Sequence, residues 1–109
     1  MTIQRVCFEF DDVRVDVANA RAWKAQKPLA IEPKAFRLLI YLLENRARLV
    51  EKEELLSAVW PDTFVTENAL TRAIAHLRKA LGDNKSGAKY IETAPIAEKK
   101  AAVRLAKAG

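Results

Sequence analysis

The sequence predicts an α+β domain: a small N-terminal antiparallel sheet, then three helices, then a C-terminal strand segment. Two observations predict it. Short apolar runs separated by turn residues occupy the first thirty positions, and residues 13–17 alternate between apolar and charged side chains, which is typical of strands with one wet face. Apolar residues then recur at helical spacing in three consecutive segments. The 109 residues fit one domain, which we divide into a sheet (1–32), a three-helix core (33–82) and a hairpin or tail (89–106).

The N-terminal strands are predicted from short apolar runs separated by turn residues. The run at 6–10 is followed by the turn signal Asp11-Asp12, and residues 13–17 then alternate between valine and a charged residue. Later apolar runs predict two more strands, at residues 22–24 and 29–31, with Lys27-Pro28 between them. Together these strands form a small antiparallel sheet.

The single cysteine and the absence of long apolar runs bear on the cellular setting. Cys7 lies in the first strand, where we expect a small buried side chain, and it has no partner for an internal disulfide. A membrane span needs a run of about 18 apolar residues, and no apolar run in the sequence approaches that length. The first ten residues lack the apolar core of a signal peptide. We therefore expect a cytoplasmic protein with no membrane segment in this chain.

The first helix is expected to be central and buried. Pro33 suits a first helical turn. Apolar side chains then follow at spacings of three and four, at Phe36, Leu39, Ile40 and Leu43. Because other apolar residues fill the gaps between them, this helix is apolar nearly all round, which is typical of a helix packed on several sides.

The second helix is expected at residues 51–60. Its first turn carries Glu51, Glu53 and Glu54, and acids there are stabilised by the positive end of the helix dipole. Pro61 ends the helix because proline cannot continue the hydrogen-bond ladder. The inner face consists of Leu55, Leu56, Val59 and Trp60.

A third helix is predicted from Glu67 to Leu81, with Thr66 as a suitable N-cap and Gly82 as a C-cap. At 100 degrees per residue, one stripe is apolar and consists of Leu70, Ile74, Leu77 and Leu81. The opposite face carries Asn68, Arg72, Ala75, His76 and Lys79, with Thr71 and Arg78 on its flanks. Arginine can pair with guanine and asparagine with adenine, and a small residue lets a helix approach a groove floor.

The positive charge is concentrated in the second part of the chain. The first 66 residues hold 10 basic and 10 acidic residues, whereas residues 67–109 hold 9 basic and 4 acidic ones. A one-sided basic region is expected of a polyanion binder, although it also suits a solvated face. The helix predicted before it favours the interpretation as a polyanion binder. Two consecutive helices, of which the second is basic outside and apolar inside, are typical of a helix-turn-helix.

The helical segments resemble a known family. Residues 33–39, 53–61 and 70–83 are similar to the OmpR/PhoB-type winged-helix DNA-binding domain, in order and with fitting spacing, and the likeness covers roughly residues 6–93. The resemblance implies an N-terminal antiparallel sheet, three helices and a C-terminal hairpin called the wing. It also implies that the third helix enters the major groove and that the wing touches the neighbouring minor groove.

The resemblance assigns roles to individual residues. It implies that Arg72, Ala75, His76 and Lys79 face double-stranded DNA, in agreement with the helical wheel. The Trp60 indole N–H could donate to a phosphate, although core packing is the favoured role. The loop between the second and third helices lies where the family often contacts RNA polymerase, and its residues are Asp62, Thr63 and Phe64. Relatives often bind as dimers or in tandem on repeated half-sites.

The C-terminal segment departs from the family pattern. The family hairpin usually ends on a strand with glycine and aromatic residues, whereas residues 102–105 contain neither. Either the wing is extended and contacts phosphates through Lys99, Lys100 and Arg104, or this alanine- and lysine-rich segment is a helical or frayed tail. The departure also motivates an alternative function, a protein-interaction module that has lost DNA binding.

The residues that enzymes need are scarce. The chain has one histidine, one cysteine and three glycines, so it offers neither a zinc-ligand spacing nor a glycine-rich phosphate loop. His76 and Cys7 lie on predicted elements of different type, which makes a catalytic pair improbable. We therefore predict no catalytic residues, no metal and no cofactor. The predicted function is that of a sequence-specific, double-stranded DNA-binding transcriptional regulator.

Overall fold

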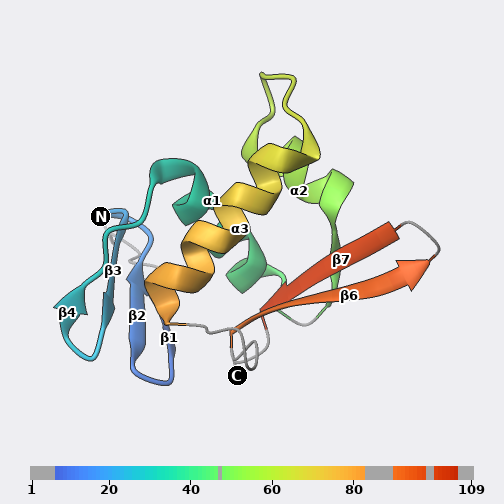
Figure 1. The fold of residues 1–109 in the computed structure, drawn as a ribbon. Coiled ribbons are helices and arrows are strands. Elements are labelled where there is room, and N and C mark those ends of the chain that lie inside the picture. Colours follow the sequence, from blue (N-terminus) through green and yellow to red (C-terminus); the bar gives the residue numbers. More distant parts are fainter. Residues whose placement is uncertain (1–6, 47, 83–89, 98–99, 106–109) are drawn as a thin grey trace, which may run out of the picture.

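The computed structural model describes residues 7–46, 48–82, 90–97 and 100–105; in the C-terminal strands it describes the side chains of residues 90–93, 102 and 103. Three helices lie between a four-stranded N-terminal sheet and a C-terminal hairpin (Figure 1). The third helix crosses the front of the molecule in this view, with the sheet on one side and the hairpin on the other (Figure 1). This arrangement is the predicted α+β winged helix-turn-helix.

The N-terminal sheet consists of β1 (Cys7–Phe10), β2 (Val13–Asp16), β3 (Arg21–Lys24) and β4 (Lys27–Pro28), paired antiparallel in that order. The valine alternation in β2 has the predicted effect, since every second side chain points into the core. The buried residues of this sheet are Phe10, Val13, Val15 and Ala22.

The position of β4 corrects the sequence prediction. A strand was expected at residues 29–31, but the chain reverses earlier, at Ala25 and Gln26, whose φ angles are 50° and 68°. Two consecutive positive φ angles form the two-residue turn that suits a twisted hairpin, so Lys24 pairs with Lys27. Such a turn usually contains glycine or asparagine. Here the turn residues are Ala25 and Gln26, so the sequence did not indicate a turn at this position.

Cys7 also differs from expectation, because it is exposed. Side chains alternate along a strand, and Phe10 takes the inward face of β1. Cys7 and Glu9 therefore share the outward face, and both are exposed. Cys7 is exposed because the register of β1 turns its side chain outward, although the side chain is small and apolar.

The helices are α1 (Pro33–Glu44), α2 (Lys52–Val59) and α3 (Glu67–Leu81). They lie at the predicted positions, and α2 is shorter than predicted by one residue at each end. The central helix α1 is the most buried, with six residues in the core: Ala35, Phe36, Leu38, Leu39, Leu42 and Leu43. Thr66 occupies the N-cap position of α3, but its side chain makes no capping hydrogen bond.

The second sheet consists of β5 (Val50–Glu51), β6 (Ile91–Ala97) and β7 (Lys100–Leu105), in the order β5-β7-β6. Of the two alternatives for the C-terminal segment, the hairpin is confirmed through Leu105. Val103 is fully buried and pairs with Val50 on one side and Thr93 on the other. Core packing therefore outweighs the helical propensity of the alanines and lysines in β7.

Candidate nucleic-acid interface

The outward face of α3 is the candidate interface. Its apolar stripe lies in the core, where Leu70, Leu77 and Leu81 are fully buried. This anchoring turns the opposite face to solvent. The predicted contact residues that are exposed on that face are Asn68, Thr71, Arg72, Ala75 and Lys79.

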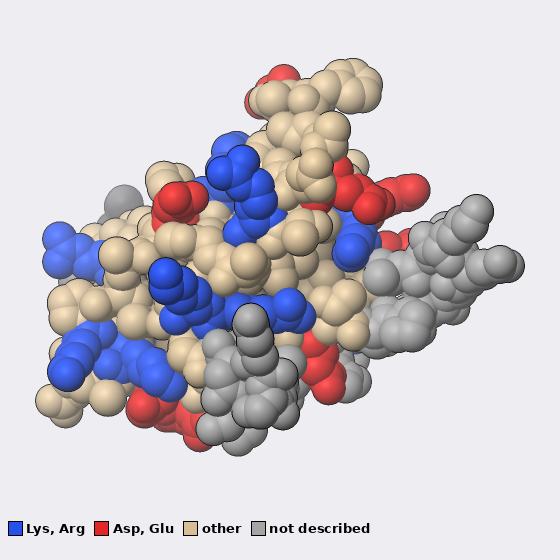
Figure 2. All heavy atoms as spheres, in the orientation of Figure 1, with Lys and Arg blue, Asp and Glu red and all other residues tan. Residues whose placement is uncertain are grey.

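The charge distribution around α3 is one-sided. Figure 2 shows Lys and Arg side chains over the face that α3 crosses and onward toward the N-terminal sheet, with Asp and Glu lying mainly at its margins. On α3 itself, the sole acid is Glu67 in the first turn, whereas Arg78 and Lys79 lie in the last turn. The middle of the exposed face therefore carries no negative charge, which suits a polyanionic partner.

His76 has a partner inside the protein. Its Nε2 accepts a hydrogen bond from the backbone N–H of Glu32 at 3.1 Å, and the side chain is half-buried. Glu32 is the residue immediately before α1, so the imidazole connects the middle of α3 to the beginning of α1. A ring nitrogen can accept only when it carries no proton, so this contact requires the neutral imidazole.

Arg78 also contacts the protein. Its guanidinium donates from Nε and Nη2 to the carbonyl oxygen of Ile91, at 3.3 and 3.1 Å, and from Nη2 to Thr93 Oγ1 at 3.1 Å. Both partners lie on β6. Sequence reasoning placed Arg78 on the flank of α3, but it could not find this contact, because the helical wheel says nothing of neighbours beyond the helix.

A polar cluster that the sequence did not reveal lies near the C-terminal end of α3. Lys24 Nζ lies 3.3 Å from the Tyr90 hydroxyl and 3.4 Å from Asp12 Oδ1, and it lies over the Tyr90 ring. The buried Tyr90 donates its hydroxyl proton to Asp11 Oδ2 at 3.1 Å. The cluster joins the β1–β2 turn, β3 and the residue before β6 near Gly82.

The Lys24 cation remains charged in this place. Burial acts to lower the pKa of Lys24, but the contacts with Tyr90 and Asp12 outweigh it, so the pKa lies above its ordinary value. A cation near the last turn of α3 is favourable, because the carbonyl end of a helix carries partial negative charge.

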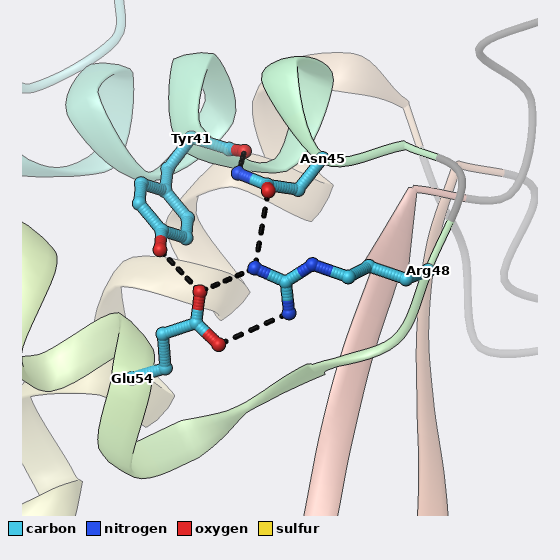
Figure 3. Close-up of polar contacts among 4 residues, drawn as sticks. All are labelled: Tyr41, Asn45, Arg48 and Glu54. Atoms are coloured by element: carbon cyan, nitrogen blue, oxygen red, sulfur yellow. Dashed lines mark hydrogen bonds and ion pairs between the residues drawn. The ribbon is translucent and has the colours of Figure 1, made fainter.

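A second polar cluster fixes α2 against α1 (Figure 3). Arg48 Nη1 donates to Glu54 Oε1 at 3.0 Å, and its Nη2 contacts both Glu54 Oε2 and Asn45 Oδ1. The Tyr41 hydroxyl donates to Glu54 Oε2, and Asn45 Nδ2 donates to the Tyr41 carbonyl at 2.8 Å. The cluster thereby connects the end of α1, the following loop and the first turn of α2.

Glu54 is the electrostatic centre of this cluster. The hydrogen bonds from Arg48 and then from Tyr41 stabilise its carboxylate, and they lower the pKa of Glu54 to about 2. The carboxylate is therefore charged throughout the range in which proteins normally work.

Trp60 and the loop after it form a separate surface. Trp60 is half-buried and packs against the core, which agrees with the favoured of its two predicted roles. The loop residues Asp62, Thr63 and Phe64 are exposed, and Phe64 is fully accessible to solvent. This loop projects beyond the helices at the top of Figure 1. A shallow hollow lies beside it, lined in part by Trp60, Leu56 and Val65.

The structure describes only part of the predicted DNA-contact residues of the hairpin. Lys100 and Arg104 lie on β7, whose backbone runs antiparallel to β6. Their side chains and the whole of Lys99 lie outside the described residues.

A metal site is not found within the described ranges, where no three His, Cys, Asp or Glu side chains lie close enough together to hold a metal ion. In the same part of the chain, no helix has the length and apolar character needed to cross a membrane.

Comparison with known proteins gives a consistent result. Residues 26–96 match a family profile described as "Transcriptional regulatory protein, C terminal". The transcriptional regulator HilA of Salmonella typhi is 38% identical over 86 residues, which cover 79% of this chain and 15% of HilA. The chain thus spans about a seventh of that relative's length.

Two solved structures have a similar fold. The response regulator DrrB of Thermotoga maritima, an OmpR/PhoB homologue, has a TM-score of 0.79 and 25% identity, covering 91% of this chain and 43% of DrrB. The RstA DNA-binding domain of Klebsiella pneumoniae, in complex with RstA box, has a TM-score of 0.78 and 21% identity, covering 92% of this chain and 96% of that domain.

Proposed function

The chain belongs to the family of C-terminal domains of transcriptional regulatory proteins, of the OmpR/PhoB winged-helix type, and from this premise we propose that it binds specific double-stranded DNA sequences with α3 in the major groove. The family is one of DNA-binding regulator domains and not of enzymes. Regulation of transcription by the whole protein is part of the proposal, as is its cytoplasmic location.

The exposed face of α3 carries this proposal. The major groove is about 12 Å wide and admits one helix. Arg72 and Lys79 are exposed and lie two turns apart on that face, and the small Ala75 lies between them. We propose that Arg72 contacts a base edge and that Lys79 contacts phosphate. Asn68 and Thr71 have exposed polar side chains in the first half of the helix. We propose that they add further contacts with DNA to those of Arg72 and Lys79.

The hairpin supplies the second contact region in this proposal. It lies beside α3 on the side away from the N-terminal sheet (Figure 1). We propose that Lys99, Lys100 and Arg104 contact phosphates or the neighbouring minor groove. The RstA DNA-binding domain, whose fold is similar, has been solved in complex with RstA box, which supports DNA binding by a domain of this fold.

Protein partners belong to the same proposal. Among the described residues, Phe64 is the large hydrophobic side chain that is exposed, and it lies with Asp62 and Thr63 on a projecting loop. We propose RNA polymerase as the partner of this loop. Binding as a dimer or in tandem on repeated half-sites is proposed for the DNA-bound state.

The alternative of an interaction module without DNA binding loses its basis. That alternative depended on the unusual C-terminal segment, but this segment forms the β6–β7 hairpin. The described residues offer no observation that favours it over DNA binding.

The proposal is tested by selecting bound sequences from a random duplex pool and then measuring affinity for the selected duplex by fluorescence anisotropy at increasing salt. We expect the logarithm of the association constant to fall linearly with the logarithm of salt concentration, with a slope of about −0.9 per phosphate contact. In Lys79→Ala, the slope should become shallower by about 0.9. Failure to bind any duplex at low salt would overturn the proposal.

A further inference from the structure

We propose that Arg78 is a positioning residue that fixes the β6–β7 hairpin against α3, and so sets the spacing at which both elements meet one duplex. The inference rests on the proposed function and deepens it. It gives Arg78 a role different from the direct DNA contact that the sequence suggested.

The contacts of Arg78 support this role. The described hydrogen bonds of its guanidinium all go to β6: two to the Ile91 carbonyl oxygen and one to Thr93 Oγ1, at 3.1 to 3.3 Å. Its side chain is half-buried, whereas the neighbouring cation Lys79 is exposed. A guanidinium that binds two acceptors of one strand determines both the distance and the orientation of that strand.

The topology explains why such a link matters. Among the described strands, the order is β5-β7-β6, so β6 follows β7 at one end of this order and pairs with it. The hairpin is joined to the helical core through β5, which is only two residues long, and through buried residues near its base such as Ile91 and Val103. Arg78 adds a direct side-chain connection from α3 to β6.

Thr93 makes the proposal testable without a change of charge. Its hydroxyl accepts from Arg78 and its side chain is exposed, so Thr93→Val keeps the shape and the β-propensity of the strand. If Arg78 acted by contacting phosphate directly, this substitution would leave DNA binding unchanged. If Arg78 positions the hairpin, Thr93→Val should reproduce part of the effect of Arg78→Ala.

The first measurement uses the protein without DNA. Spin labels are attached at Glu67→Cys on α3 and Lys100→Cys on β7 in a Cys7→Ser background, and the distance between them is measured by pulsed electron resonance. We expect one narrow distribution in the parent protein and in Lys79→Ala. Arg78→Ala should lose this narrow peak to a broad distribution, and Thr93→Val and Arg78→Lys should broaden it less. Circular dichroism establishes that each variant is folded.

The second measurement is the salt dependence of binding to the selected duplex. Lys79→Ala should reduce the slope by about 0.9, the equivalent of one phosphate contact. Arg78→Ala should reduce it by about 1.8 or more, because displacement of the hairpin removes several contacts at once. Thr93→Val should also reduce it although it removes no charge.

The outcomes separate the two proposals. Unchanged distance distributions in Arg78→Ala and Thr93→Val would overturn the positioning role, whether or not the protein binds DNA. If Arg78→Ala reduces the salt slope by only about 0.9, the equivalent of one phosphate contact, and Thr93→Val leaves the slope unchanged, Arg78 contacts phosphate directly instead. Absence of duplex binding by the parent protein would overturn the proposed function, while the distance measurement would still report on the Arg78 link.

Discussion

At the scale of single residues, the end of α3 depends on a backbone conformation that most amino acids avoid. Gly82 has a φ angle of 85° and ends the helix in the left-handed region. A methyl group added there would lie 3.5 Å from Lys24 Cε, which is an ordinary contact. The requirement for glycine therefore comes from the backbone and not from crowding.

Gly82→Ala should lower the free energy of unfolding by about 1 kcal/mol, because alanine is strained in the left-handed conformation. For a domain of this size, that corresponds to a fall of about 4–8 °C in Tm, measured by circular dichroism. Gly82→Asn is the matched comparison. Its free energy of unfolding should fall by less than that of Gly82→Ala, since asparagine tolerates this conformation. Equal losses for the two variants would contradict the explanation.

Residue-scale prediction succeeded where the cause is local. The left-handed cap at Gly82 and the outward face of Arg72 follow from positions within one helix. The exposure of Cys7, the Glu32 contact of His76 and the β6 contacts of Arg78 all depend on neighbours distant in the sequence. No local pattern carries that information.

At the scale of elements, the cluster centred on Glu54 holds α2 to the end of α1. The folded state keeps the pKa of Glu54 at about 2, below the ordinary value of 4.5, through hydrogen bonds from Arg48 and Tyr41. Because folding lowers this pKa, the ionised carboxylate stabilises the fold above pH 4.5. That contribution is lost as the pH falls from 4.5 toward 2.

Glu54→Gln should therefore destabilise the protein by about 1 kcal/mol at pH 7, a modest value because the pair is partly exposed. The difference from the parent should shrink as the pH falls through the same window, as measured by urea unfolding at each pH. Glu53→Gln is the matched control, since it removes an exposed acid from the same first turn of α2. A deficit in Glu54→Gln that persists unchanged at the lowest pH would refute this account.

Helices were predicted more accurately than strands, for physical reasons. The apolar stripes of α1 and α3 repeat over several turns, so their positions are overdetermined by the sequence. The strand β4 has two residues and follows a turn without glycine, and its position was predicted wrongly. The strand β7 exists because Val103 is buried between two partners, whereas its local composition equally suits a helix.

At the scale of the whole molecule, two surfaces are separated. The exposed face of α3 lies between the N-terminal sheet and the hairpin, whereas the loop that carries Phe64 projects from the α2–α3 connection (Figure 1). DNA contact and protein contact would therefore use different side chains. Substitutions should affect one without the other.

Phe64→Ser should leave the free energy of unfolding within about 0.5 kcal/mol of the parent value, because the ring is fully exposed. Affinity for the selected duplex should also be unchanged. Transcription from a promoter that carries this duplex, measured with purified RNA polymerase and the full-length regulator, should respond more weakly to the variant. An unchanged response would remove polymerase as the partner of this loop.

The central claim is that the outward face of α3 reads base sequence, and the affinity of Arg72→Ala for two duplexes tests it most directly. Parent and variant are titrated at the same salt concentration against the selected duplex and against a scrambled one. We predict that Arg72→Ala loses about 1–3 kcal/mol of binding free energy on the selected duplex and clearly less on the scrambled one. An equal loss on both duplexes would contradict base reading by α3.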